Sequence, residues 1–474
     1  MLICVCWGRK HRKATKVRKH HHHHKPSEPA FLTKLLEKGK ISEAQKLASV
    51  KPLSDGLPSY AGYFTVDEAK DSNMFFWYVP TLAKDKKPHE IPVILWLNGG
   101  PGASSLYGAF GELGPYKLEK TGKLRRNKHS WIEFAHMLFI DNPVGVGFSF
   151  TSSKHGYSTN QSQVGHNLYV SLVQFFTLFP ELQRNPFVVA GASYAGKYIP
   201  AVGYAIHTNN PKAKLKINLQ GLALGNAWVD PINMLDFGDI LYPNGLLDTN
   251  GYHEFNRLRD NVQDLIRKKQ FREAYDIYDR WILGDTTPYR TLYNNLTGLN
   301  NYFNFLKIGK LNAGGKTVPE KWINFFHEHD FGKRFNVGNR TFQRPIIVAE
   351  SLREDILNSV ADWLAVLMEN YRVMIYNGLL DIKCGFLLTE NYLNKLKWKG
   401  SKGYKEAPRH HWYVKKSLEG YWKKTGKFTQ VAVRNSGHSV PKDKPKVAQK
   451  LMFTFAYDLP FQSTPKVSKK KSKH

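Results

Sequence analysis

The sequence predicts an α/β fold with a mostly parallel central sheet and helices on both faces. Continuous apolar runs at 92–97 and 136–141 are typical of strands that are buried on both sides. Helical spacing at 167–179 separates such runs. An apolar strand at 187–190 then ends at a glycine, and Ser193 follows among small residues. This strand–turn–helix pattern is that of a nucleophile elbow, in which a serine projects from a strained turn.

The other elements follow from the spacing of apolar residues, which is two in strands and three to four in helices. We expect a short helix and turn at 31–48, antiparallel strands at 59–66 and 74–79, a strand at 217–224, a helix along 352–367, a strand at 373–376, a hairpin at 411–433 and a helix at 445–457. The last helix carries Pro445 in its first turn, where proline is well tolerated.

The alternation of strands and helices stops in the middle of the chain. We expect residues 29–232 and 346–458 to form the α/β core. Residues 233–345 begin with a polar helical pattern and continue without a clear period, so we predict an inserted cap lobe over the C-terminal ends of the strands. Residues 1–28 and 459–474 are expected to lie outside the fold as basic tails.

The formal net charge of +30 is unevenly spread, because residues 1–28 hold eight Lys/Arg against one acid and residues 466–474 hold five lysines. Such tails favour contact with polyanions or anionic surfaces, with solubility alone as the alternative. No apolar stretch approaches the roughly eighteen residues of a membrane span. We find no zinc spacing and no basic–aromatic module. We therefore expect no metal, no cofactor, no membrane span and no specific nucleic acid, and the oligomeric state is not indicated.

Cysteine usage and sequons bear on the compartment. Three cysteines (Cys4, Cys6 and Cys384) are too few for a disulfide framework in a chain of this size. The apolar heptad at 1–7 is followed by basic residues, which is the wrong order for a signal peptide. Sequons permit a secretory route without arguing for one, and they are candidate glycosylation sites: Asn160, Asn295 and Asn339.

Two residues downstream complete the chemistry that Ser193 needs. Asp381 follows a strand and an Asn-Gly turn, and His438 lies on the loop after another strand. Ser…Asp…His is the order of the triad in α/β-hydrolases. A histidine takes the serine proton, and a carboxylate orients the imidazole. Singly, Asp381 could be a turn cap and His438 one of nineteen histidines. The backbone N–H groups of Tyr194 and Gly100 would form the oxyanion hole.

Four long motifs surround this predicted site: Trp96–Gly102, Phe110–Pro115, Asp141–Ser149 and Ser193–Tyr198. They resemble those of the serine carboxypeptidase family, and the chain is most similar to its vitellogenic carboxypeptidase-like branch. The resemblance runs from about residue 31 to 458. It implies an α/β-hydrolase that removes C-terminal residues from peptides with a free C-terminus, in lysosomal, vacuolar or secretory compartments. It also implies that Asn98, Gly99 and Glu112 bind the terminal carboxylate.

Some positions depart from the family pattern. Ala192 stands where the family has a glutamate that lies beside the one matching Glu112. Ser439 and two lysines at 442 and 444 are further departures, and the disulfide cysteines are missing. Two close carboxyls share a proton, so the loss of this pair predicts an ionised Glu112 that repels the substrate carboxylate. We therefore expect carboxypeptidase activity that is weakened at neutral pH.

The expected function is a serine-type carboxypeptidase that works through an acyl-enzyme. Two alternatives use the same fold. The triad could serve esterase, amidase or acyltransferase chemistry, or the protein could be a weakly active or non-catalytic binding relative.

Overall fold

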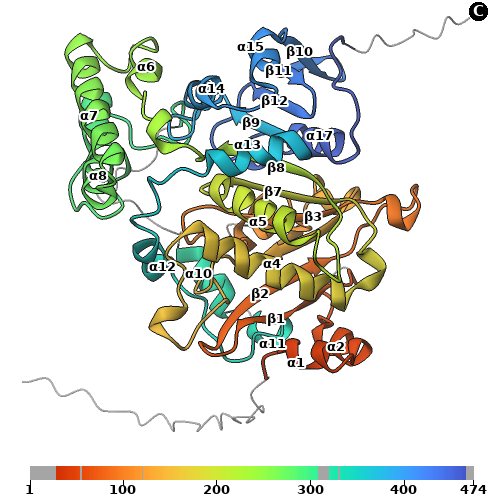
Figure 1. Ribbon diagram of the computed structural model, residues 1–474. Helices are drawn as coiled ribbons and strands as arrows, with labels where there is room; N and C mark the ends of the chain where they lie inside the picture. Colours follow the sequence, from red (N-terminus) through yellow and green to blue (C-terminus); the bar gives the residue numbers. More distant parts are fainter. Residues whose placement is uncertain (1–27, 54–55, 120, 308–319, 329–330, 466–474) are drawn as a thin grey trace, which may run out of the picture.

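The computed structural model describes residues 28–53, 56–119, 121–307, 320–328 and 331–465. Its centre is a ten-stranded sheet in the order β1-β2-β6-β3-β7-β8-β9-β12-β11-β10 (Figure 1). The six strands from β6 to β12 in this order run parallel, and antiparallel pairs extend both edges. This arrangement confirms the mostly parallel sheet.

The strands have the following bounds: β1 Tyr60–Asp67, β2 Ser72–Val79, β3 Val93–Leu97, β6 His136–Ile140, β7 Phe187–Ser193, β8 Leu219–Ala227, β9 Arg372–Gly378, β10 His410–Val414, β11 Ser417–Thr425 and β12 Phe428–Val433. A separate small sheet pairs β4 (Tyr116–Leu118) with β5 (Leu124–Arg126). The hairpin expected at 411–433 is instead three strands, because a second reversal at Gly426 adds β12 to the parallel sheet.

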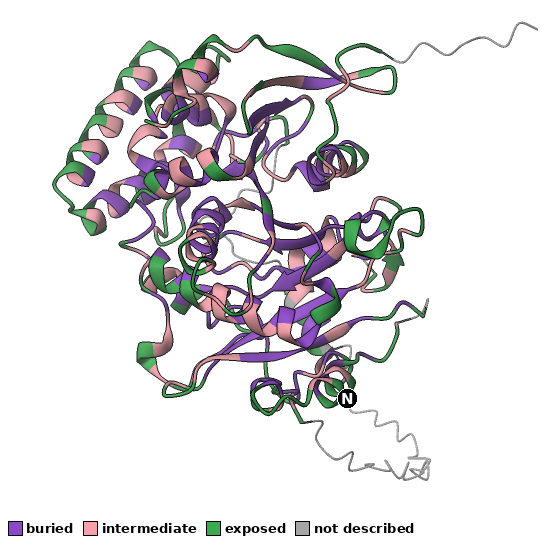
Figure 2. Ribbon diagram, turned by 45° about the vertical axis from the view of Figure 1, so that its right-hand side comes forward, coloured by how far each residue is buried: buried purple, intermediate pink, exposed green. Residues whose placement is uncertain are grey.

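Successive residues of the central strands bury into two different cores, one on each face of the sheet. In β3, Leu95 and Leu97 enter the first core, and Ile94 and Trp96 enter the second. Figure 2 shows the sheet buried between helices whose outer surfaces are exposed. Continuous apolar runs in these strands reflect this burial on both faces, as expected from the sequence.

Helices contribute to both cores. The first core receives α1 Thr33–Glu37, α2 Ile41–Ala48, α4 Gln161–Leu178, α5 Ala195–Asn209, α6 Gly238–Leu241, α7 Thr249–Arg267, α8 Phe271–Tyr278, α9 Leu292–Thr297, α12 Ile346–Ser351, α13 Ala361–Asn370, α14 Phe386–Lys395 and α15 Ser401–Glu406. The second core receives α3 Leu106–Gly111, α10 Glu320–Glu328, α11 Phe331–Arg334, α16 Val440–Asp443 and α17 Pro445–Ala456. Among the described residues, no helix has the length and apolar character needed to cross a membrane.

The segment from 233 to 345 contributes two groups of helices. Helices α6 to α8 lie together at one side of the molecule, whereas α10 and α11 lie near β1 and β2 (Figure 1). The second group packs through aromatic rings, with Phe335 over Trp77 and Phe325 over Phe110. The limits of an inserted lobe remain a prediction.

Two expectations from the sequence are wrong. The helix expected along 352–367 exists only from Ala361, because residues 352–360 form irregular turns that carry Asp355 into the interior, beside Lys197. The segment 459–465 was expected to lie outside the fold. It packs on the sheet edge, where Phe461 stacks on Trp422 and the Gln462 carbonyl accepts a hydrogen bond from the Tyr413 N–H over 2.8 Å.

Candidate active site

Ser193 is the last residue of β7, and α5 begins two residues later at Ala195. Its φ of +67° is in the left-handed region, where residues other than glycine carry strain, and such strain is concentrated at functional sites. The preceding glycine is required by space, because a Cβ at Gly191 would lie 2.4 Å from the Leu97 carbonyl oxygen. The sequence pattern of small residues around Ser193 thus reflects backbone packing at a sharp turn.

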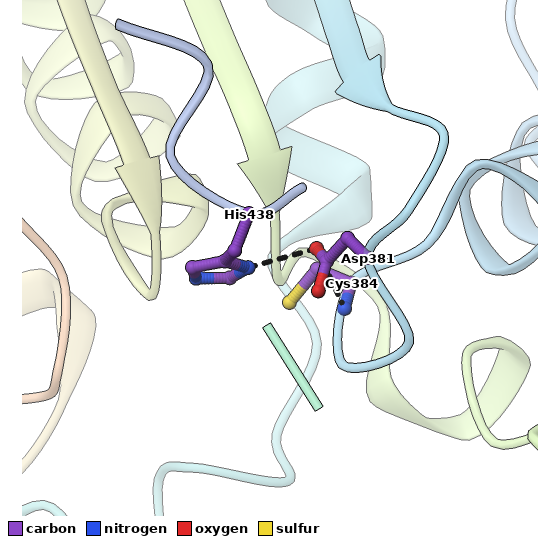
Figure 3. Close-up of side chains that lie close together, drawn as sticks. All are labelled: Asp381, Cys384 and His438. Atoms are coloured by element: carbon purple, nitrogen blue, oxygen red, sulfur yellow. Dashed lines mark hydrogen bonds and ion pairs between the residues drawn. The ribbon is translucent and has the colours of Figure 1, made fainter. Parts of the chain in front are cut away.

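Asp381 and His438 come together on neighbouring loops, after β9 and β12 respectively. His438 Nδ1 lies 2.8 Å from Asp381 Oδ2 (Figure 3). The carboxylate also accepts hydrogen bonds from the backbone N–H groups of Lys383 and Cys384. Because a carboxylate only accepts, Nδ1 carries the imidazole proton in this pair and Nε2 holds the lone pair.

The second imidazole nitrogen, His438 Nε2, is buried and has no hydrogen-bond partner among the described residues. It is the nitrogen that a general base uses. Ser193 stands on β7 and Asp381 follows β9, with β8 between them, and His438 follows β12 on the other side of β9. The carboxyl ends of these parallel strands meet at one edge of the sheet, so the topology collects all three predicted triad residues there.

The histidine loop is held by a segment that lies far away in the sequence. Phe303 accepts a hydrogen bond from the His438 N–H through its carbonyl oxygen over 2.7 Å, and its ring centroid lies 4.6 Å from the imidazole centroid. The neighbouring Tyr302 carbonyl accepts from the Ile382 N–H over 2.9 Å. The segment thus bridges both loops of the pair. This role could not be predicted from the sequence, because residues 286–342 show neither helical nor strand periodicity.

Asn226 is a second functional residue that sequence reasoning missed. Its side-chain amide donates to Asp381 Oδ2 over 2.8 Å, and its Oδ1 accepts from the Gly378 N–H. An asparagine just before the end of a strand has no distinctive sequence pattern, and only the positive φ of 40° marks it in the structure.

The loop after β3 lies against the nucleophile. A Cβ at Gly99 would stand 2.4 Å from the Tyr194 backbone nitrogen and 2.9 Å from Ser193 Cβ. Gly100 follows with a φ of +113°. Within the described residues, no turn, loop or side-chain hydrogen bond uses the N–H of Gly100 or Tyr194. The loop after β3 thus lies against the elbow through Gly99, and the oxyanion role of the Gly100 and Tyr194 N–H groups stays a prediction.

Behind the elbow lies a buried polar cluster. The Tyr194 hydroxyl donates to Asp355 Oδ2 over 2.8 Å, and Lys197 Nζ lies 2.8 Å from the same oxygen. Gln161 Nε2 donates to it over 2.6 Å. The exposed fractions are 0% for Lys197 and 5% for Asp355, so this is a fully desolvated ion pair. It ties the start of α5, and with it the residue after the nucleophile, to the loop before α13.

The residues expected to bind a terminal carboxylate lie on the loop after β3 and at the end of α3. Asn98 Oδ1 accepts hydrogen bonds from Trp96 Nε1 over 2.8 Å and from the Gly108 N–H over 3.1 Å. These two donors fix the orientation of the amide. The amino group of Asn98 is therefore the end that can donate to an anion.

Glu112 is the acid among these three residues. It follows α3, and burial raises the pKa of its carboxyl, while Ser439, Lys442, His438 and Lys117 act in the opposite direction. A partner acid at position 192 is thus not needed to favour the protonated form, because removal of water does so. Burial therefore acts against the ionisation of Glu112 expected from Ala192, and the role of Glu112 in carboxylate binding stays a prediction.

Cys384 lies beside the His438–Asp381 pair, and its Sγ, an Asp381 oxygen and a His438 nitrogen fall within 4.8 Å of one another (Figure 3). Three such groups are potential metal ligands. Burial raises the pKa of the Cys384 thiol, however, whereas metal binding uses the thiolate. The carboxylate is already occupied by Asn226 and by backbone donors. These contacts and the protonated thiol argue against a metal site at this cluster.

The candidate glycosylation residues lie apart from this site. Asn295 and Asn339 are exposed, and Asn160 is half-buried at the start of α4, where its side chain accepts a hydrogen bond from the Gln163 N–H.

Comparison with known proteins gives a consistent family. The sequence profile of the serine carboxypeptidase family matches residues 52–457. The chain is 46% identical over 435 residues to the venom serine carboxypeptidase of Apis mellifera, which covers 91% of this chain and 92% of that protein. It is 41% identical over 438 residues to the human probable serine carboxypeptidase CPVL, with 91% and 90% covered. It is also 41% identical over 434 residues to the vitellogenic carboxypeptidase of Aedes aegypti, with the same coverage.

A solved structure agrees on the fold. The yeast Saccharomyces cerevisiae protein Kex1Δp, a prohormone-processing carboxypeptidase, superposes with a TM-score of 0.75 at 24% identity, covering 89% of this chain and 98% of that one. The sheet order, the profile match and these identities agree, and the chain belongs to the serine carboxypeptidase family of α/β-hydrolases.

Proposed function

We propose that Ser193, Asp381 and His438 are the catalytic triad of this serine carboxypeptidase, which releases residues from the free C-terminus of peptides through an acyl-enzyme. The observation that carries the proposal is the His438–Asp381 hydrogen bond, 2.8 Å long, which leaves Nε2 buried and without a partner in the described part of the chain. A serine on a strained elbow at the same sheet edge is the nucleophile that such a base activates.

The chemistry follows the atoms of the triad. His438 Nε2 takes the proton as Ser193 Oγ attacks the last peptide carbonyl, and the N–H groups of Tyr194 and Gly100 stabilise the oxyanion. The imidazolium then gives its proton to the leaving amine, and the C-terminal residue departs. A water, deprotonated by the same nitrogen, hydrolyses the ester. Asp381 keeps the imidazole oriented and stabilises its charged form.

The free carboxylate of the peptide defines which bond is cut. Asn98 through its amino group, Gly99 through its N–H and a protonated Glu112 are the proposed donors to it. The site lies next to the nucleophile because the Gly99 backbone touches the elbow. An amidated C-terminus carries no charge, so it is the natural control substrate for this part of the proposal.

Substitution of the triad tests the assignment. We expect Ser193→Ala to lower kcat/KM by about four to six orders of magnitude, and His438→Ala by a similar factor, with the double variant little worse. Hydrolysis of an N-blocked dipeptide, followed by release of the free amino acid, is the measurement. If Ser193→Ala keeps a tenth of the activity, the triad is wrong. If esters are cleaved by wild type but free peptides are not, esterase chemistry replaces carboxypeptidase chemistry.

We also propose that the protein works in the secretory pathway, in lysosomes or outside the cell. The exposed Asn295 and Asn339 sequons support this, as do relatives named for venom and vitellogenesis. Removal of N-glycans should shift the apparent mass of protein from secreting cells, and Asn295→Gln should reduce the shift. An unshifted mass would contradict glycosylation.

The basic tails outside the described residues are proposed to bind polyanions. Deletion of 1–28 and 466–474 should weaken heparin retention and leave kcat/KM on a neutral peptide within about twofold, because exposed charge is screened over roughly 10 Å. Unchanged retention would overturn this part.

A further inference from the structure

Three residues form a row across the sheet next to the nucleophile. Ala192 of β7 pairs with Gly225 of β8, and Gly225 pairs with Tyr376 of β9. Residues in direct register point to the same face of a sheet. That face is the second core, which contains Tyr376 and against which Ala192 packs. Helix α3, which is followed directly by Glu112, covers the same face.

The Tyr376 side chain lies across β8 toward Ala192. A Cβ built at Gly225 would lie 2.4 Å from Tyr376 Cζ and 2.5 Å from its hydroxyl oxygen. The end of the phenol therefore occupies the space above Gly225, and any side chain there would displace it. Neighbouring strands are about 5 Å apart, so the hydroxyl stands roughly one strand spacing from the small side chain of Ala192.

The hydroxyl has nothing to bond to. Tyr376 has an exposed fraction of 2%, and its oxygen has no hydrogen-bond partner among the described residues. A buried hydroxyl without a partner is unfavourable, and phenylalanine would avoid the loss. Burial raises the pKa of Tyr376, and the nearby Glu112 carboxyl raises it further. The phenol is therefore a permanently protonated donor that lies close to the proposed carboxylate site.

We propose that the Tyr376 hydroxyl donates a hydrogen bond to the C-terminal carboxylate of the bound peptide, in the space beside Ala192. This inference rests on the proposed function, because it adds a member to the site of Asn98, Gly99 and Glu112. The phenol stays protonated across the working pH range, so it supplies a donor that does not depend on the protonation of Glu112. It makes Tyr376 a binding residue that determines the preference for a free C-terminus.

The test is Tyr376→Phe with two substrates, an N-blocked dipeptide with a free carboxylate and the same dipeptide as the C-terminal amide. We expect kcat/KM on the free acid to fall about tenfold, mainly through KM, because a hydrogen bond to a charged group is lost. On the amide it should change less than twofold. An unchanged rate on the free acid, or equal losses on both substrates, would overturn the inference.

Tyr392→Phe is the matched control, because this tyrosine of α14 is also fully buried with an unpartnered hydroxyl. It should leave both rates unchanged. Both variants should melt at or above the wild-type temperature, since each removes only an unpartnered hydroxyl. A selective loss of free-acid activity in a Tyr376→Phe protein that melts normally cannot come from misfolding.

The ratio of the wild-type kcat/KM for the free acid to that for the amide separates this inference from the proposed function. If wild type cleaves free acid and amide equally well, the carboxylate site as a whole is wrong. If wild type prefers the free acid and Tyr376→Phe keeps the same preference, the site stands and the role of Tyr376 is wrong.

Discussion

The side-chain amide of Asn226 donates to the same oxygen of Asp381 that meets His438 Nδ1, and both distances are 2.8 Å. Asp381 Oδ2 thus connects the His438 imidazole to the end of β8. Asn226 is in turn fixed by the Gly378 N–H, which donates to its Oδ1 over 3.0 Å. Asp381 is therefore held from β8 as well as from its own loop.

We expect Asn226→Ala to lower kcat by about ten- to hundredfold, because a hydrogen bond to a charged group is worth roughly 1.5–3 kcal/mol and the carboxylate loses its fixed position. Steady-state kinetics together with thermal melting measure it. Asn185→Ala is the control, since Asn185 is equally buried but donates to carbonyls at 88 and 91. If both variants lose melting temperature and neither loses kcat, Asn226 is only structural.

The sequence predicted what depends on local pattern. Buried apolar runs located the central strands, and the order Ser193, Asp381 and His438 indicated the strand ends at which these residues lie. These features depend on the spacing of apolar residues in strands and on small residues at the elbow turn. Both are set by residues that are close together in the sequence.

The rest depends on contacts between distant segments. Residues 352–360 have helical spacing, but they form irregular turns that place Asp355 in the buried ion pair with Lys197. The supporting roles of Phe303 and Asn226 depend on loops that meet only in the folded protein. The pKa of Glu112 depends on its burial, and the presence of alanine at position 192 does not reveal that burial.

Lys197 and Asp355 should couple strongly in stability. Lys197→Met leaves a carboxylate buried with only neutral donors, which should cost about 3–5 kcal/mol of unfolding free energy. The double variant Lys197→Met/Asp355→Leu should recover much of that loss, because neither charge is then buried. Denaturant unfolding measures both. Equal losses in the single and double variants would contradict the view that the unpaired charge is the cause.

Asp141 should make the protein more stable in acid than at neutral pH. Burial raises the pKa of this carboxyl to about 7, although the Ser104 hydroxyl and the Phe148 N–H donate to it. Between about 4, the unfolded value, and about 7, the folded state holds a proton that the unfolded state has lost. Its stability contribution is complete below that window and falls as pH rises through it, by up to about 1.4 kcal/mol per pH unit.

Melting temperatures of wild type and Asp141→Asn from pH 4 to 7 measure this effect. The amide does not titrate, so the decline toward neutral pH should be shallower in the variant. The exposed Asp362→Asn is the control and should keep the wild-type profile. Parallel profiles for wild type and Asp141→Asn would show that Asp141 is ionised throughout.

Ala192→Glu should strengthen the preference for a free C-terminus and extend this preference to higher pH. In wild type, protonated Glu112 is present below its raised pKa and is lost as pH rises through it. The ratio of kcat/KM for a free-acid peptide to that for its amide should therefore fall with rising pH. A second carboxyl at position 192 shares a proton with Glu112, because two close charges are unfavourable. One acid then remains a donor to higher pH.

We expect the ratio at neutral pH to rise by about five- to thirtyfold in Ala192→Glu, equivalent to roughly 1–2 kcal/mol for one hydrogen bond to the carboxylate. The fall in the ratio should also move to higher pH. Ala192→Gln is the matched control, since its amide donates but cannot share a proton. It should raise the ratio without moving the pH at which it falls. A ratio that neither variant changes would mean that position 192 does not line the carboxylate site, and an equal pH shift in both would exclude proton sharing as the cause.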